Sequence, residues 1–214
     1  MFLGKMNTKK LRILIPCFGI IIFVMLYFVA TFYYPGGSNE DKAAKGFDWL
    51  NNYWCDLTVE LAKNGAINSA RPIALAAMLI LCSSLIAFWY YLPLLFKDFK
   101  FNPVIRYCGI SSMIVAIFLF TGFHDTVINI SGALGFLAFT ATFIGLYKNK
   151  FYSYFIFGLF CLILMITNYF IYQSNYFISF LPILQKATFI SFLLLICLID
   201  IKIFRTNQEI RNKK

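Results

Sequence analysis

Long apolar runs, each of about 20 residues, recur along the chain and constrain its fold more than any other feature. A helix rises about 1.5 Å per residue, so a run of this length matches the roughly 30 Å hydrocarbon core of a bilayer. The sequence therefore predicts an all-α fold, a bundle of six transmembrane helices. We place the spans at about 11–33, 72–95, 103–122, 126–147, 151–172 and 182–204.

Composition agrees with this prediction. Hydrophobic residues make up 61% of the chain and charged residues 13%, whereas about 25% of residues are charged in soluble domains. The first run is longer than the 7 to 15 apolar residues typical of a signal peptide, so we interpret it as a retained helix. The only sizeable segment outside the spans is 35–71, and residues 1–214 are therefore predicted to form a single integral membrane domain.

Basic residues predict the orientation of the bundle. They concentrate before the first span, in the two connections after spans two and four, and after the last span, at 5–12, 97–106, 148–150 and 202–214. The positive-inside rule puts these segments, and so both termini, in the cytoplasm of a cell whose plasma (inner) membrane holds the protein. Because the net charge of +10 is spread in this way and not pooled in one patch, we predict no nucleic-acid partner.

The cysteines predict neither a disulfide nor a zinc site. Five of the six lie inside spans, and only Cys55 falls in the segment between spans one and two. No pair is therefore available for an extracytoplasmic disulfide, and the spacing matches no zinc motif. We interpret the five as small buried apolar residues, and no cofactor is evident.

The segment between spans one and two has a helical period in GFDWLNNYWCDLTVELAKNG. Apolar residues recur at intervals of three and four, while Asp48, Asn52, Asp56 and Glu60 recur every four residues. This predicts one amphipathic helix over 46–63, lying at the outer membrane surface. Trp49, Tyr53 and Trp54 are of the type found at the headgroup level. The polar line is either a solvated face or a set of carboxylates turned over the mouth of the bundle.

Polar and ionisable residues gather at the predicted outer ends of the helices. GFHDTVINISG contains the only histidine, His124, followed by Asp125, and Asn129 comes one turn later. Arg71 precedes span two, while Gln185 and Lys186 lie about one turn inside span six. Ionisable groups at membrane depth are by default candidates for a functional site. The sequence therefore predicts a site that opens to the outer leaflet.

Small residues predict the position of span four. Ser131 and Gly135 form a small-xxx-small pair, which allows another helix to approach closely. We therefore expect span four to be central in the bundle.

Several motifs together resemble a known family. They are YYPGGS, GFDWLNNYWCDL, NGAINSARPIA, HDTVINISGALGF and LPILQK, between about residues 34 and 186. They are similar to the prokaryotic membrane proteins grouped as domain of unknown function number 998, particularly those of the Bacteroidetes. That family is distantly similar to the eukaryotic FRAG/DRAM/SFK group, which includes a factor in glycolipid-anchor remodelling. The resemblance implies a six-helix bundle with cytoplasmic termini and transfers no catalytic residue.

Our leading functional hypothesis is a lipid-directed hydrolase or transferase that acts at the outer leaflet on membrane lipids. His124, oriented by Asp125, would be the general base or a metal ligand, because its ordinary pKa of about 6.5 suits both roles. The second carboxylate would come from Asp56, with Asp48 and Glu60 as further candidates. The residues that would bind the substrate and its phosphate are Arg71, Lys186, Asn129 and Gln185.

Other interpretations stay open. Asp125 is equally suited to capping the start of span four, which would make the His-Asp pair structural. A metal bound by His124 and the carboxylates is a further open alternative. The alternative functions are a non-catalytic binder or carrier of a lipid or small anion, and a structural protein of membrane assembly. The sequence identifies no protein partner.

Overall fold

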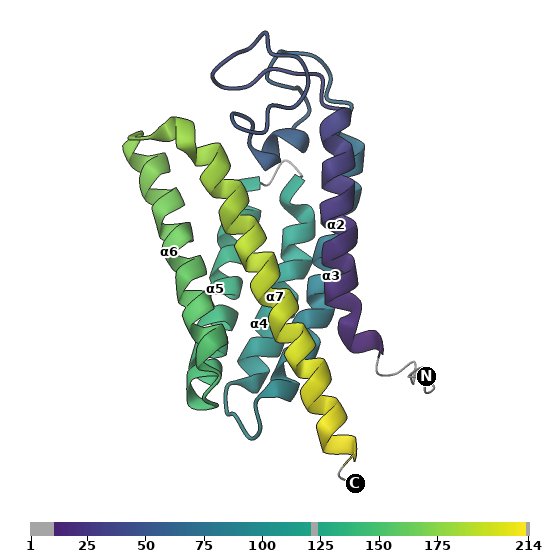
Figure 1. Ribbon diagram of the computed structural model, residues 1–214, viewed down its shortest axis with the longest axis vertical. Helices are drawn as coiled ribbons and strands as arrows, with labels where there is room; N and C mark the ends of the chain where they lie inside the picture. Colours follow the sequence, from purple (N-terminus) through teal and green to yellow (C-terminus); the bar gives the residue numbers. More distant parts are fainter. Residues whose placement is uncertain (1–10, 121–123, 213–214) are drawn as a thin grey trace. The chain divides into compact units, whose positions relative to one another are not determined.

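The computed structural model describes residues 11–120 and 124–212, with the side chains of 120, 124, 125 and 208–212 outside the described part. Within these ranges all regular secondary structure is helical, which confirms the all-α prediction. The long helices, shown in Figure 1, are α2 (Ile15–Phe32), α3 (Arg71–Tyr91), α4 (Asn102–Ala116), α5 (His124–Lys148), α6 (Tyr152–Ser174) and α7 (Leu181–Asn212). Short 3₁₀ helices are η1 (Arg12–Leu14), η2 (Trp54–Leu57), η3 (Leu92–Leu95), η4 (Ile117–Phe120) and η5 (Ile178–Phe180).

Six helical segments of the described chain are long and apolar enough to cross a membrane. They are Arg12–Phe32, Arg71–Leu95, Asn102–Leu119, Thr126–Lys148, Tyr152–Ser174 and Ile178–Asn207. Each coincides with a span predicted from the sequence to within a few residues. Prolines help to set two of the starts, because Pro72 and Pro103 lie in the first turns of α3 and α4, where a missing N–H costs nothing. The chain is therefore a multi-pass membrane protein.

The chain forms two compact units. The first unit comprises Met1–Ile21, Leu79–Ile156 and Leu195–Lys214, and the second unit comprises Ile22–Met78 and Phe157–Leu194. The division falls within α2, α3, α6 and α7. The assignment of all residues to one domain stays a prediction.

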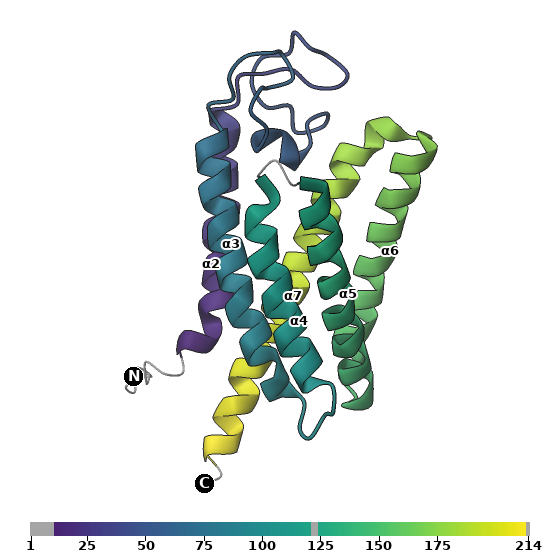
Figure 2. The same cartoon turned by 180° about the vertical axis from the view of Figure 1, so that it is seen from behind.

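In the first unit, α4 and α5 lie side by side (Figures 1 and 2). The Ser112 hydroxyl of α4 donates a 2.8 Å hydrogen bond to the carbonyl oxygen of Ser131 on α5. A Cβ atom added to Gly135 would lie 3.2 Å from the Ser112 hydroxyl oxygen. The predicted close helix approach at Ser131 and Gly135 is thus confirmed, and a side chain at Gly135 would require the Ser112 hydroxyl to shift slightly.

In the second unit, residues 33–70 connect α2 to α3; we call this segment the 33–70 loop. It contains one short helix, η2, and two isolated β-bridges, Gly36 with Lys45 and Leu61 with Ile67. The prediction of a continuous amphipathic helix over 46–63 is therefore wrong. Gly37 has a φ of 82° and its Cα lies against the backbone of Asn64, so the loop folds back closely on itself.

Side chains that bind nearby backbone groups explain why this segment is not a helix. The Asp48 carboxylate accepts hydrogen bonds from the N–H groups of Leu50 (2.8 Å) and Asn51 (3.3 Å). The Asn52 amide oxygen accepts from the N–H of Asp48 at 2.9 Å. Short polar side chains of this kind offer the backbone an alternative to helical hydrogen bonds. The polar residues that recur every four positions therefore lie in a folded loop and not on one face of a helix.

Candidate functional site

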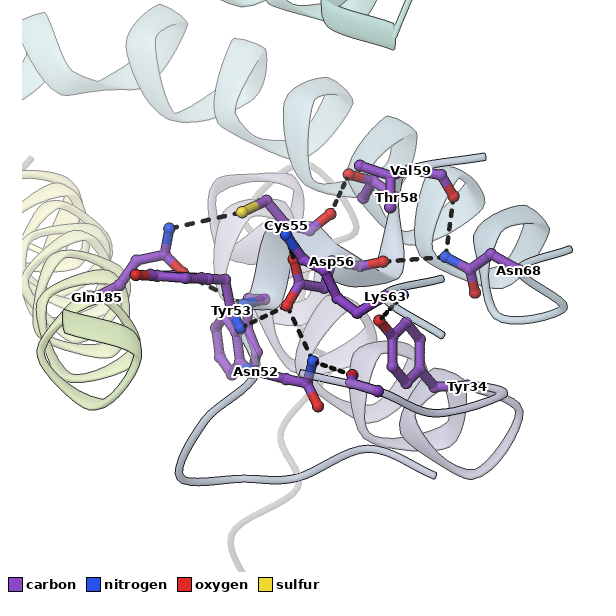
Figure 3. Close-up of polar contacts among 12 residues, drawn as sticks. Tyr34, Asn52, Tyr53, Cys55, Asp56, Thr58, Val59, Lys63, Asn68 and Gln185 are labelled. Atoms are coloured by element: carbon purple, nitrogen blue, oxygen red, sulfur yellow. Dashed lines mark hydrogen bonds and ion pairs between the residues drawn. The ribbon is translucent and has the colours of Figure 1, made fainter. Parts of the chain in front are cut away.

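Asp56 lies at the centre of the polar contacts in the 33–70 loop (Figure 3). Asp56 is only 3% exposed. One carboxylate oxygen accepts hydrogen bonds from the Asn52 side-chain amide (3.0 Å) and the Tyr53 N–H (2.9 Å), and the other lies 3.6 Å from the Lys63 ammonium. Both oxygens are therefore engaged by the loop itself, which encloses the carboxylate that the sequence suggested for catalysis.

Two buried asparagines extend this network, and sequence reasoning did not assign either to the site. The Asn52 amide also donates to the carbonyl oxygen of Gly37 at 2.8 Å. The Asn68 amide donates to the carbonyl oxygens of Asp56 (3.0 Å) and Val59 (2.9 Å), while its own oxygen accepts from the N–H of Ala70. An available signal for Asn68 was its place in the segment just before a helix that starts with Arg-Pro, because asparagine favours turns in which its side chain bonds the backbone two residues on.

Gln185 and Lys186 at the start of α7 hold the loop to that helix. The Gln185 side-chain oxygen accepts from the N–H of Trp54 at 3.2 Å, and its amide nitrogen lies 3.8 Å from the Cys55 sulfur. Lys186 is only 8% exposed, and its ammonium donates to the carbonyl oxygen of Asn52 at 2.5 Å. The structure thus brings both residues to the predicted place, but their polar groups bind the loop.

Trp54 is a core residue of the second unit. Its ring centroid lies 6.2 Å from that of Phe23, 5.6 Å from that of Tyr27 and 5.4 Å from that of Phe189. The residue is buried among these rings from α2 and α7. Its predicted position among lipid headgroups is therefore wrong, because two helices distant in sequence enclose it.

Arg71 and Glu60 form a looser pair at the protein surface. The Arg71 Nε donates to the carbonyl oxygen of Thr58 at 3.3 Å, and its Nη1 lies 4.0 Å from a Glu60 carboxylate oxygen. The Glu60 side chain is 81% exposed. Exposed pairs of this kind contribute about 0 to 1 kcal/mol to stability. The main role of Arg71 is therefore its hydrogen bond to the loop backbone.

Asp48 stabilises the turn that follows it. Its second oxygen accepts from the Asn51 side-chain amide at 2.8 Å. Hydrogen bonds from this amide and from the Leu50 N–H hold the pKa of Asp48 below its usual range, so the group is ionised at neutral pH. Asp48 therefore stabilises a local turn, whereas Asp56 stabilises the loop as a whole.

The surroundings of the predicted catalytic pair stay outside the description. His124 and Asp125 are the first two residues of α5, but their side chains lie outside the described part of the chain. Asn129, one turn later, is exposed. Within the described residues, no group of three or more His, Cys, Asp or Glu side chains is arranged to hold a metal ion. The metal hypothesis, which depends on His124, stays a prediction.

Sequence reasoning also missed Asp200, a fully buried residue of α7 in the first unit. The Cys17 thiol of α2 donates to one of its carboxylate oxygens at 3.2 Å and lies 3.7 Å from the carbonyl oxygen of Cys197. An acidic residue inside a predicted span was the available signal. This contact assigns Cys17 a hydrogen-bonding role in addition to the apolar role expected of it.

Taken together, polar contacts of the second unit join the 33–70 loop to α3 through Arg71 and to α7 through Gln185 and Lys186. Asp56 and its partners hold the loop itself together (Figure 3). Such a network positions a loop. No family model matches the chain, and no curated protein or solved structure matches it either.

Proposed function

We propose that this protein is a non-catalytic membrane protein that binds lipid through the 33–70 loop. The observation that carries the proposal is the enclosure of Asp56, whose two carboxylate oxygens are both engaged within the loop. A general acid or base must come within about 3 Å of the proton that it transfers. The enclosed carboxylate and the buried Lys186 ammonium lack that access. A catalytic function would therefore depend on His124 and Asp125 or on the exposed carboxylate of Glu60.

The surface of the loop supports a binding function. Structureless loops longer than about 15 residues are uncommon in compact domains and are usually functional when they are ordered. This loop also carries exposed large apolar side chains, namely Trp49, Leu50, Val59, Leu61 and Ile67. Contiguous apolar surface commonly marks an interaction site, and Trp49 and Leu50 are adjacent in the chain. At the end of membrane spans, lipid is the apolar partner that is always present.

Three further elements of the proposal come from the sequence. The positive-inside pattern supports cytoplasmic termini in a plasma (inner) membrane, which would place the 33–70 loop on the extracytoplasmic side. The motif resemblance supports membership in the prokaryotic family of domain of unknown function number 998. The distant similarity of that family to a group that includes a glycolipid-anchor remodelling factor is compatible with lipid binding.

The binding part of the proposal can be tested by native mass spectrometry of the purified protein with added phospholipid. We expect the wild type to retain phospholipid, and the retained amount to fall when Trp49, Leu50, Leu61 and Ile67 are replaced by serine. The matched control replaces the exposed aromatic residues Tyr176, Phe177 and Phe180, between α6 and α7, by serine. Equal loss in the two sets of variants would contradict binding by the 33–70 loop.

The non-catalytic part requires a separate assay. The protein is reconstituted in vesicles that contain phospholipid and glycolipid, and the lipids are analysed by mass spectrometry after incubation. We expect their composition to stay unchanged. A hydrolysis or transfer product that the wild type forms and His124→Ala abolishes would overturn the proposal and favour the enzyme.

A further inference from the structure

Trp49 lies against the exposed side of a membrane span. Its ring centroid is 6.0 Å from that of Phe28 on α2, and the Phe28 centroid is 5.1 Å from that of Phe32. All three side chains are exposed, and Phe28 and Phe32 belong to the span Arg12–Phe32. An exposed side chain on a span faces lipid. The loop at Trp49 therefore continues the lipid-facing surface of α2.

The position of Phe28 fixes the depth of this contact. Phe28 lies four residues before the end of α2, which corresponds to about 6 Å along the helix axis. A ring that contacts Phe28 is thus close to the end of the span, where acyl chains meet headgroups. Tryptophan is enriched at that boundary because its ring is apolar and its N–H is polar.

Backbone N–H groups in the turn around Trp49 are hydrogen-bonded within the turn, which suits a boundary where water is scarce. The Asp48 side chain accepts from the N–H groups of Leu50 and Asn51, and the N–H of Asn52 donates to the carbonyl oxygen of Asp48 at 2.8 Å. Unpaired backbone groups are costly where water is scarce. These N–H groups are paired within the turn, while Trp49 and Leu50 are 42% and 62% exposed.

We infer that the turn 48–51 inserts Trp49 and Leu50 into the headgroup–acyl boundary of the adjacent leaflet, with phospholipid as the partner. This inference rests on the proposed lipid-binding function and names the surface that contacts lipid. It also excludes Trp54, five residues later, from that contact, since Trp54 is buried in the core of the second unit.

Fluorescence quenching by brominated phospholipids tests the inference. Wild type and Trp49→Phe are reconstituted in vesicles whose acyl chains carry bromine either near the headgroup or near the terminal methyl. The difference between the two proteins isolates Trp49 from the buried Trp54 and Trp89. We expect stronger quenching of Trp49 by bromine near the headgroup, and weak quenching by aqueous iodide. A second reporter, Leu50→Trp in the Trp49→Phe protein, should behave in the same way.

Two results would overturn the inference: equal lipid quenching of wild type and Trp49→Phe, or efficient quenching of Trp49 by iodide. The lipid-retention measurement separates this failure from failure of the proposed function. Retained phospholipid without lipid quenching of Trp49 contradicts only the location of the contact. Quenching of Trp49 by lipid in a protein that retains no phospholipid contradicts the binding function and leaves the membrane-inserted turn in place.

Discussion

At the scale of single residues, the carboxylates of the 33–70 loop differ in what surrounds them. Asp56 is buried and accepts hydrogen bonds from two donors, whereas the Glu60 side chain is exposed and has only a long contact with Arg71. Removing one partner from a buried network leaves the others without a hydrogen bond, which is costly. Removing one partner of an exposed pair leaves the other in water.

We therefore expect Asp56→Ala to lower the free energy of unfolding by about 2 to 3 kcal/mol, because buried donors lose their acceptor. Glu60→Ala is the matched control, with an expected change below about 1 kcal/mol. Thermal unfolding of the detergent-purified variants measures both. Similar midpoints for the two variants would show that the Asp56 network does not stabilise the loop.

At the scale of helices, Gly109 and Gly132 of the first unit lie in very different surroundings. A Cβ atom added to Gly109 of α4 would lie 2.2 Å from a ring atom of Trp89 on α3, so these helices approach closely. A Cβ added to Gly132 of α5 would have nothing within 4 Å. The same residue type therefore supports helix packing at one site and has no packing role at the other.

Gly109→Ala should destabilise the protein by about 1 to 3 kcal/mol, since the Trp89 ring must move to accommodate the new methyl group. Gly132→Ala should leave stability unchanged or raise it by up to about 1 kcal/mol, because alanine is the better helix former. Unfolding midpoints and the near-ultraviolet circular dichroism of the tryptophans check both expectations. Equal destabilisation would contradict close packing at Gly109.

At the scale of the whole molecule, the orientation of the chain in the membrane is a prediction that one cysteine can test. Cys55 is the exposed cysteine of the described loop, and the other five cysteines lie within predicted spans. Cytoplasmic termini would place Cys55 on the extracytoplasmic side of the membrane. The charge asymmetry of the connections is the physical basis for this orientation.

A membrane-impermeant maleimide should therefore label the protein in intact cells, and Cys55→Ser should remove the label. Mass spectrometry of the labelled peptides gives the site. Labelling of Cys55 only in inside-out vesicles would show that the termini face outward. In that case the lipid contact of Trp49 would belong to the inner leaflet.

The membrane-spanning helices could be predicted from the sequence because they depend on a local property. A run of about 20 apolar residues is long enough to span the hydrocarbon core whatever the rest of the chain does. The close approach of α4 to α5 at Ser131 and Gly135 followed from the same kind of reasoning. Small residues permit close approach wherever a helix is packed. Both predictions needed only the residues of one segment.

The loop could not be predicted in this way. The four-residue spacing of Asp48, Asn52 and Asp56 fits a helix, but their side chains bind turns of the loop. Trp49 and Trp54 are alike in sequence, yet rings from α2 and α7 enclose Trp54 and leave Trp49 at the surface. The sequence by itself determined that the chain crosses a membrane. Only the tertiary structure decided which polar groups are enclosed, because that depends on contacts between residues more than 100 positions apart.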